Sequence, residues 1–335
     1  MYNRRSALHE AIKCIGFIYG NRFVKQSEYI SQTKGVIHGV NRINYATFVV
    51  IIYPIMIIIA DSGSTKTDWC LGCTRADSRI VRTEGINPFH QTSDEISRLI
   101  ASSLMPHTGS ASRITNIFFY GAGCTPEKCG SVKDALSAHF PQADIHVESD
   151  LLGAARALCG TKAGIACILG TGSNSCTYNG EKITDHIPPL GYILGDEGSG
   201  AALGKQLAGD CLKRQLPEDL CQSFLKEYQL TTALVQEKVY RQPLANRFLA
   251  SLTPFLHTHR HRPEIHALLI ECFSDFFRRN VMSYRAYPNL PVHFTGSIAF
   301  HFEEEVKEAA TSLGISVGRT LKSPMEGLKE YHWQD

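Results

Sequence analysis

The chain has 335 residues, of which 43% are hydrophobic and 20% are charged, and its formal net charge is +2. This composition is that of an ordinary globular protein, and the length suffices for two domains with hydrophobic cores. The near-neutral charge gives no argument for a nucleic-acid or membrane-surface partner. The eleven cysteines are scattered and odd in number, which is more typical of reduced thiols in a cytoplasm than of a disulfide framework.

The first 55 residues differ from the rest of the chain. Residues 1–44 show no sustained hydrophobic period, and residues 45–60 are almost wholly apolar. This apolar run is shorter than the ~20 residues that a membrane-spanning helix needs, and Pro54 interrupts it. We therefore expect residues 1–55 to be an N-terminal extension outside the fold, with Met56 as a possible true start. A genuine tail or anchor is the alternative.

The stretch Met56–Trp69 predicts a buried strand, a tight polar turn and a second strand. Its apolar run ends at Asp61, and Ser62-Gly63-Ser64-Thr65 follows, where a backbone can turn and point N–H groups at an anion. Such an Asp-x-Gly-x-Thr turn suits a site where Mg²⁺ meets a polyphosphate, because the carboxylate can hold the metal and the turn can hold the phosphate. An ordinary polar hairpin turn is the alternative for this stretch alone.

Alternating strands and helices are predicted after this turn. The strands are expected at 67–71, 80–83, 114–120 and 143–148, and the helices at 94–104, 130–139 and 151–158. Ser93 or Asp94 is expected near the cap of the first helix. Between these elements, residues 85–90 form a turn-rich loop in which Pro88 keeps Asn87 extended.

The same arrangement then recurs in the second half of the chain. A buried strand at 164–169 leads into the turn Gly170–Asn174 and a strand at 175–178, and Asn179-Gly180 is a hairpin signal. Residues 212–280 are mostly helical, strands follow at 292–294 and 315–319, and a helix is expected at 324–331. This duplication indicates an α/β protein with domains at residues 56–163 and 164–322 and a C-terminal helix within 323–335.

Common nucleotide-binding motifs do not account for these turns. The stretch Gly198–Lys205 has the wrong glycine spacing for a P-loop, and Gln206 stands where a hydroxyl must hold Mg²⁺. The Gly-x-Gly turns at 121 and 170 lack the third glycine of a dinucleotide-binding fingerprint. Neither a Walker ATPase nor a Rossmann dehydrogenase is therefore supported.

Four turns together resemble the signature turns of the actin, sugar-kinase and Hsp70 superfamily. They are Asp61-x-Gly63-x-Thr65, Gly170-Thr171-Gly172-Ser173-Asn174, Gly195-Asp196-Glu197-Gly198-Ser199 and Thr295-Gly296-Ser297. They most resemble the N-acetylglucosamine kinase branch, together with the BadF/BadG-type ATPases, and the resemblance covers residues 56–331. It implies two ribonuclease-H-like (actin-like ATPase) domains around a cleft. It also implies a cytoplasmic, ATP- and Mg²⁺-dependent kinase of an amino sugar.

The resemblance also implies roles for individual residues. Asp61 resembles the Mg²⁺-side carboxylate, and Asp150 resembles the general base. A plain helix N-cap is the other interpretation of Asp150, and the two roles are compatible. The residues implied for ATP are Gly63, Ser64, Thr65, Lys66, Thr171, Gly172, Gly296 and Ser297. Those implied for the sugar are Asn87, Asp150, Ser173, Asn174, Leu190, Gly191 and Asp196, among which short amides and acids suit fixed hydroxyl groups.

The precise substrate and two other functions stay open at this point. The resemblance favours N-acetylglucosamine phosphorylated at its 6-hydroxyl, with N-acetylmuramic acid and glucosamine as alternatives. Ser62-Gly63-Ser64 replaces the triple glycine of the animal members and resembles the bacterial pattern. A BadF-type activator would need an iron–sulfur cluster, for which Cys124 and Cys129 are the nearest candidates. A sugar sensor would need a DNA-binding segment, which residues 1–55 do not suggest. A homodimer also stays open.

Overall fold

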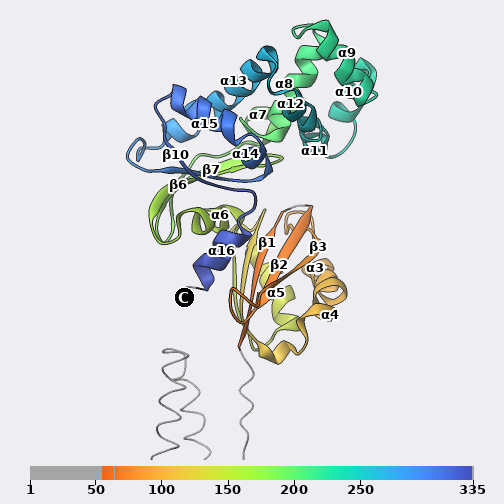
Figure 1. Ribbon diagram of the computed structural model, residues 1–335. Helices are drawn as coiled ribbons and strands as arrows, with labels where there is room; N and C mark the ends of the chain where they lie inside the picture. The colour runs from red at the N-terminus through yellow and green to blue at the C-terminus, as the bar shows by residue number, and fades with distance from the viewer. Residues whose placement is uncertain (1–54, 64, 334–335) are drawn as a thin grey trace, which may run out of the picture. The chain divides into compact units, whose positions relative to one another are not determined.

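The computed structural model describes residues 55–63 and 65–333. The predictions made for residues 1–54 and for Ser64 lie outside the described residues. The described chain forms two five-stranded mixed sheets with helices packed on them (Figure 1). No helix in this part of the chain combines the length and the apolar character needed to cross a bilayer.

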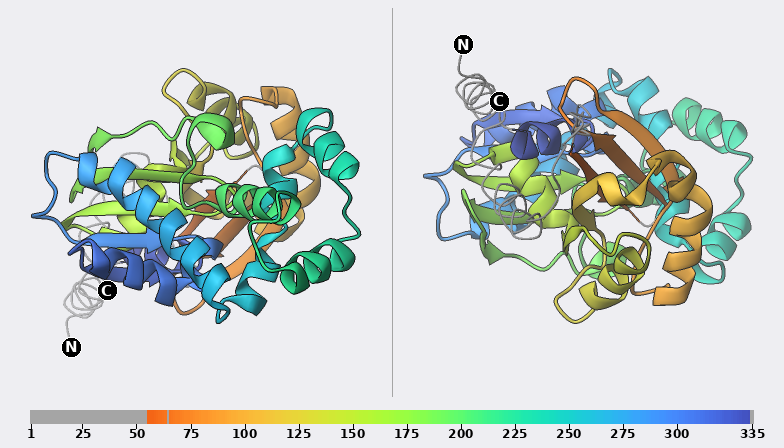
Figure 2. Two further views of the ribbon diagram at one scale, coloured as in Figure 1. Left: turned by 90° about the horizontal axis from the view of Figure 1, so that it is seen from above. Right: turned by 90° about the horizontal axis from the view of Figure 1, so that it is seen from below.

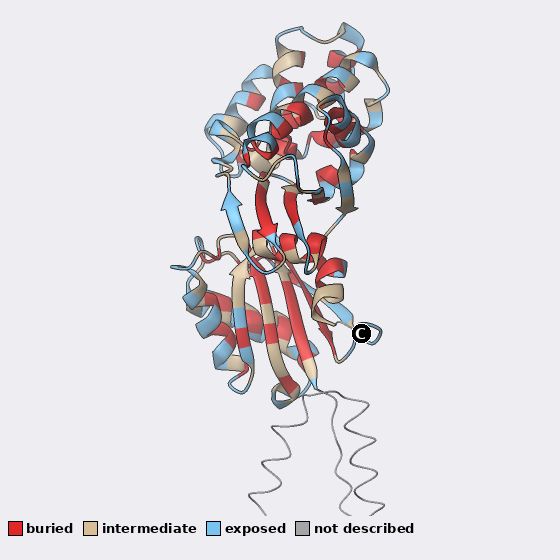
Figure 3. Cartoon of the chain, turned by 90° about the vertical axis from the view of Figure 1, so that its left-hand side faces the viewer, coloured by how far each residue is buried: buried red, intermediate tan, exposed pale blue. Residues whose placement is uncertain are grey.

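The first sheet has the strand order β3-β2-β1-β4-β5. Its central strand, β1, is antiparallel to β2 and parallel to β4. The apolar residues Ile57–Ala60 of this strand are at most 5% exposed, because a central strand is covered on both faces (Figure 3). The strands are β1 (Met56–Ser62), β2 (Lys66–Gly72), β3 (Arg79–Glu84), β4 (Ile114–Gly121) and β5 (Asp144–Ser149).

The second sheet repeats the topology of the first. Its order, β8-β7-β6-β9-β10, has the same pairing directions, with β6 antiparallel to β7 and parallel to β9. The duplicated α/β architecture predicted from the sequence is therefore confirmed. The strands are β6 (Ala163–Leu169), β7 (Ser173–Asn179), β8 (Ile183–His186), β9 (Val292–Thr295) and β10 (Val317–Leu321).

The helices of the first half differ in detail from the prediction. The expected helix at 94–104 is an α-helix that continues as a π-helical turn. Its N-cap is Thr92, which forms a capping box with Glu95, so Ser93 and Asp94 lie next to the cap, as expected. The helical segments are α3 (Ser93–Leu99), the π-helix η3 (Ile100–Leu104), α4 (Met105–Thr108), the 3₁₀ turn η4 (Ala111–Arg113), α5 (Cys129–His139) and α6 (Asp150–Cys159).

The second half carries most of the helices. Apolar residues of α8, α13 and α15 form one core with strands β6 and β9, and Figure 2 shows these helices running across the sheet. The short helix α7 was not predicted. The segments are α7 (Gly191–Leu194), α8 (Gly200–Leu212), α9 (Glu218–Glu227), α10 (Thr232–Tyr240), α11 (Ala245–Ala250), α12 (Thr253–His259), α13 (Pro263–Arg279), the 3₁₀ turn η5 (Val281–Ser283), α14 (Ser297–His301), α15 (Glu303–Ser312) and α16 (Met325–His332).

Helix α6 contributes to the cores of both sheets. Leu151, Ala155 and Leu158 pack with residues of β6 and β7. On another side of the helix, Ala157 packs with residues of β1 and of the C-terminal helix α16. The residue that opens α6, Asp150, is therefore held by an element that both cores fix in place.

Helix α16 is joined to both sheets by polar contacts as well. Glu330 accepts from Arg75, in the connection between β2 and β3, at 3.0 Å and from Arg319 of β10 at 2.8 Å. His332 Nε2 lies 2.8 Å from the hydroxyl of Tyr120, and the ring of His332 stacks on Phe118 at a centroid distance of 3.9 Å. The C-terminal helix is thus a structural link between the two sheets.

Candidate active site

The end of strand β1 and its hairpin bring three charged residues together. Asp61 lies directly opposite Asp68 in the antiparallel register, so both carboxylates stand on the same face of the sheet. Lys66 Nζ lies 2.7 Å from Asp68 Oδ2, and the Gly63 N–H donates to the Lys66 carbonyl at 3.0 Å, which closes the turn. Asp61 and Lys66, which were both predicted as site residues, are therefore neighbours. Ser64 lies outside the described residues.

The environment of Asp61 suits a cation. Burial, together with repulsion from the carboxylates of Asp150 and Asp68, raises the pKa of Asp61 to about 7, although Lys66 and the Ser323 hydroxyl act against the rise. Within residues 55–63 and 65–333 no basic side chain forms an ion pair with Asp61, although Asp68 has two such partners. A carboxylate with these neighbours is stabilised in its charged form by a divalent cation, so the residues present fit Mg²⁺.

Asp150 is the first residue of α6, close enough to Asp61 for the two carboxylates to repel each other. The N-cap of α6 is Ser149, whose hydroxyl accepts from the Leu152 N–H at 3.2 Å, so the interpretation of Asp150 as the N-cap is wrong. Asp150 Oδ1 instead accepts from the Leu151 N–H at 2.9 Å. Burial raises the pKa of Asp150, although the Leu151 N–H acts against the rise. A raised pKa makes a carboxylate a stronger base.

The second turn brings several of the predicted site residues together. Asp196 is buried, and its Oδ1 accepts from the Ser173 N–H at 3.1 Å. A Cβ added at Gly172 would lie 3.0 Å from Asp196 Oδ2. The Thr171 carbonyl accepts from the Ala201 N–H at 3.0 Å, so the start of α8 fixes the turn. Burial raises the pKa of Asp196 despite the Ser173 N–H.

The other predicted sugar contacts on this half differ in their surroundings. Asn174 Oδ1 accepts from the Ser175 N–H and lies 2.9 Å from His186 Nε2. Leu190 is 62% exposed with a left-handed backbone, and Gly191 opens helix α7. The Pro189 carbonyl accepts from the Asp196 N–H at 3.0 Å, which ties this loop to Asp196. This backbone contact holds the loop that carries Leu190 and Gly191 next to Asp196.

The third candidate turn lies where β9 ends and α14 begins. Gly296 has a φ of +117°, and a Cβ there would lie within 2.2 Å of the Leu169 carbonyl, so only glycine fits. Thr295 Oγ1 is buried and has no hydrogen-bond partner among the described residues. Ser297 is exposed at the start of α14. The unpaired Thr295 hydroxyl could form a hydrogen bond with a nucleotide bound at the turn Gly296–Ser297, so this turn fits a nucleotide site.

Asn87 lies in the loop between β3 and α3. Its Oδ1 accepts from the Phe89 N–H at 3.0 Å, and its own N–H donates to Gln91 at 2.8 Å. A Cβ at Gly123 would lie 2.3 Å from Asn87 Oδ1 and 2.8 Å from the Phe89 ring. The loop that carries Asn87 is thus packed against the loop that follows β4.

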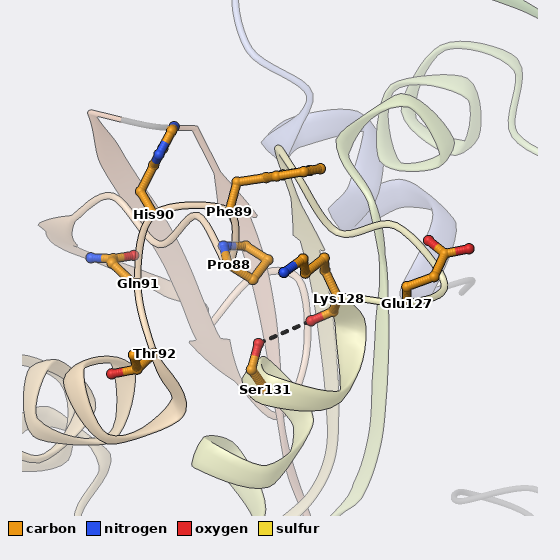
Figure 4. A pocket seen from close by; sticks show the side chains of 8 residues that line it. All are labelled: Pro88, Phe89, His90, Gln91, Thr92, Glu127, Lys128 and Ser131. Carbon is orange, nitrogen blue, oxygen red and sulfur yellow. Dashed lines mark hydrogen bonds between the residues drawn. The ribbon is translucent and has the colours of Figure 1, made fainter.

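These two loops enclose a pocket of about 460 Å³ (Figure 4). Lys128 points toward Pro88 in this view, whereas Glu127 points away from it. Lys128 Nζ also lies 5.9 Å from the centre of the Phe89 ring. The residues that line the pocket are Pro88, Phe89, His90, Gln91, Thr92, Glu127, Lys128 and Ser131. The pocket therefore offers an aromatic ring and a cation next to Asn87.

Cys124 and Cys129 also lie next to each other, since their thiols interact. Burial raises the pKa of Cys124 to about 12, and the pKa of Cys129 is also raised, mainly by burial. Among the described residues no further His, Cys, Asp or Glu joins these two thiols in a group of three or more that could hold a metal ion.

Sequence reasoning missed Asp68, its partner Arg82, and Ser323. Asp68 carries the ion pairs with Lys66 and Arg82, and Ser323 reaches Asp61 from the segment before α16. Asp68 could have been found by pairing the two strands of the first hairpin, because the register places it opposite Asp61. No local pattern could have identified Ser323, which is 262 positions from Asp61 in the sequence.

Comparison with known proteins identifies relatives among solved structures. No protein-family model matches the chain, and no curated protein does. The chain is 50% identical to the "Putative N-acetylglucosamine Kinase" from Porphyromonas gingivalis, with a TM-score of 0.79 over 84% of this chain and 99% of that one.

A second solved structure is more distant. The "Putative N-acetylglucosamine Kinase" from Chromobacterium violaceum is 19% identical, with a TM-score of 0.64 over 83% of this chain and 99% of that one, and it supports the fold alone. The identity to the first protein extends over nearly its whole length. Together with the two repeated sheets and the four turns, it shows that the chain belongs to the N-acetylglucosamine kinase-like family of actin-like sugar kinases.

Proposed function

We propose that the protein transfers the γ-phosphoryl group of ATP to the 6-hydroxyl of an N-acetylated amino sugar, with N-acetylglucosamine as the preferred acceptor. The observation that carries the proposal is the convergence of Asp61 and Asp150, two carboxylates with raised pKa values, where β1 ends and α6 begins. Asp61 suits a metal-bound polyphosphate, and Asp150 suits a hydroxyl that must lose a proton.

The chemistry divides between these residues. Asp150 accepts the proton of the sugar hydroxyl as the hydroxyl oxygen attacks the γ-phosphorus of ATP and the bond from that phosphorus to the ADP leaving group breaks. The Leu151 N–H keeps the carboxylate oriented. Asp61 would hold Mg²⁺, and this ion would supply positive charge next to the phosphates of ATP. The turns at Gly63–Lys66 and Thr171–Gly172 position the phosphates, and the turn at Gly296–Ser297 receives the adenosine. Positioning of this kind supplies much of the rate of phosphoryl transfer.

Polar groups from both halves of the chain would orient the sugar. Asn174 and Asp196 stand on or near the second turn, and Ser173 is tied to Asp196. Asn87 approaches from the loop after β3. Leu190 and Gly191 would line the N-acetyl group. Because these groups come from residues 56–163 and 164–322, the two parts would act as domains that close over a cleft when both ligands bind.

The pocket beside Asn87 favours N-acetylmuramic acid as a second candidate acceptor. This sugar carries a lactyl carboxylate that N-acetylglucosamine lacks, and Lys128 would supply a cation for it.

The free thiols of the described residues support a cytoplasmic location.

A substrate panel with Mg²⁺ and ATP tests the proposal. N-acetylglucosamine, N-acetylmuramic acid, glucosamine and glucose would be compared by kcat/KM, and the phosphorylated carbon would be assigned by NMR. We expect the highest kcat/KM for N-acetylglucosamine and a product phosphorylated at carbon 6. Absence of phosphorylation of every amino sugar would refute the proposed function.

A further inference from the structure

A ladder of charged side chains runs across three strands of the first sheet at the proposed phosphate turn. Asp61 of β1 lies opposite Asp68 of β2, and Asp68 lies opposite Arg82 of β3. Directly opposite residues of antiparallel strands share a face, with Cβ atoms roughly 4.5–5.5 Å apart. Lys66 precedes Asp68 by two positions and so shares this face too. Two carboxylates and two cations are therefore gathered at one end of the sheet.

The cations are distributed unequally between the two carboxylates. Asp68 holds both of them, with Lys66 Nζ 2.7 Å from Oδ2 and Arg82 Nε 2.6 Å from Oδ1. The side chain of Asp68 is 9% exposed, whereas those of Lys66 and Arg82 are 52% and 64% exposed. Asp68 is therefore the buried anchor, and each of its oxygens has a charged partner.

Lys66 is also close enough to Asp61 to act on it. Its charge stabilises the ionised form of Asp61, yet its ammonium group is hydrogen-bonded to Asp68. A lysine has three donors on a flexible stem and can exchange between neighbouring carboxylates. If Lys66 paired with Asp61, it would compete with a metal ion for that carboxylate.

We propose that Asp68 is a positioning residue that keeps Lys66 away from Asp61, so that Asp61 stays available to the metal while the ammonium group stays at the phosphate turn. This inference rests on the proposed function, because it takes Asp61 as the Mg²⁺ carboxylate. It adds a role for a residue that neither the turn motif nor the comparisons single out.

The test measures metal binding apart from turnover. Mn²⁺ serves as the paramagnetic probe for Mg²⁺, and its dissociation constant is measured by electron paramagnetic resonance with the full chain and a non-hydrolysable ATP analogue. Asp68→Asn keeps the size of the side chain but releases Lys66. We expect Mn²⁺ to bind about tenfold more weakly, a loss of about 1.4 kcal/mol. The Mg²⁺ concentration for half-maximal activity should rise by more than kcat falls.

A double-mutant cycle separates this mechanism from other roles of Asp68. In a Lys66→Met background no lysine can compete for Asp61, so adding Asp68→Asn should change Mn²⁺ affinity by less than about twofold. Arg82→Met is the matched control, since it removes the other partner of Asp68 and leaves Lys66 held. It too should change Mn²⁺ affinity by less than about twofold.

Three outcomes would overturn the inference or its basis. Wild-type Mn²⁺ affinity in Asp68→Asn would overturn it, and so would an equal loss in the Lys66→Met background. If Asp68→Asn does not fold, Asp68→Ser is measured in the same assay with the same expectation, because it also releases Lys66. Asp61→Asn addresses the proposed function itself: unchanged Mn²⁺ binding there would remove the metal site rather than the role of Asp68.

Discussion

Asp150 combines a local structural contact with the proposed chemical role. Its Oδ1 accepts from the Leu151 N–H in the first turn of α6, while Ser149 serves as the cap. An asparagine at this position retains an oxygen for that contact but has no basic charge. The substitution therefore separates the contribution of Asp150 to the helix from its contribution to the reaction.

We expect Asp150→Asn to lower kcat by about 10²–10⁴, the usual range for the loss of a general base, with a small change in KM for the sugar. The melting temperature should stay within about 2 °C of the wild type, because the Ser149 cap is intact. Steady-state kinetics and thermal melting give both numbers. A wild-type kcat in this variant would show that another group accepts the proton.

Residues in the four turns could be selected from the sequence because each turn has a local pattern. A run of apolar residues that ends at Asp61 or at Gly170 is visible without any partner strand. The ion pairs of Asp68 could not be selected in this way. They depend on which residue of β1 and which of β3 lie opposite Asp68, and that register emerges only when the hairpins are paired.

Elements with strong hydrophobic patterns were predicted closely, and those without were not. The strand expected at 315–319 lies at Val317–Leu321, because this strand contains few apolar residues to mark its ends. The π-helical turn Ile100–Leu104 and the four-residue helix α7 were missed, since single turns leave no periodic signal. Ser93 and Asp94 lie near the cap of α3, as expected, although the cap itself is Thr92, whose capping box with Glu95 the prediction did not include.

Helix α16 carries a titratable group whose charge state matters for its attachment. Burial, together with the charges of Arg156 and His146, lowers the pKa of His332 to about 3. The neutral ring stacks on Phe118 and contacts the Tyr120 hydroxyl. Protonation would place a charge in this partly buried setting, close to the guanidinium of Arg156.

The folded-state pKa of His332 is below its value of about 6.5 in an unfolded chain, so the unfolded state binds the proton more readily. The contribution of the neutral His332 ring to the stability of the folded state is therefore complete above about pH 6.5, and it is lost as the pH falls toward 3. We expect His332→Phe, which keeps the stacking, to reduce the fall in melting temperature between pH 7 and pH 5 by about 2–4 °C. An unchanged pH dependence in the variant would contradict this account.

At the scale of the whole molecule, the fold described here starts at Met56. Strand β1 begins at that residue, and the members of the four hydrophobic clusters that lie among the described residues, 55–63 and 65–333, are at or after Met56. We therefore expect a chain that starts at Met56 to keep its melting temperature within about 2 °C and its kcat/KM within about twofold of the full chain. Melting curves and kinetics on both chains provide the measurement. A loss of folding would show that residues 1–55 contribute to stability.

The sharing of α6 between two hydrophobic cores has a consequence for how the molecule unfolds. Ala157 of this helix belongs to the cluster of β1 and α16, and Leu151, Ala155 and Leu158 belong to the cluster of β6 and β7. If either half melted alone, it would leave one side of α6 without its apolar partners, so the halves should lose structure cooperatively. Scanning calorimetry of the ligand-free protein should then show a single heat-absorption peak, and two resolved peaks would mean that α6 does not couple the halves.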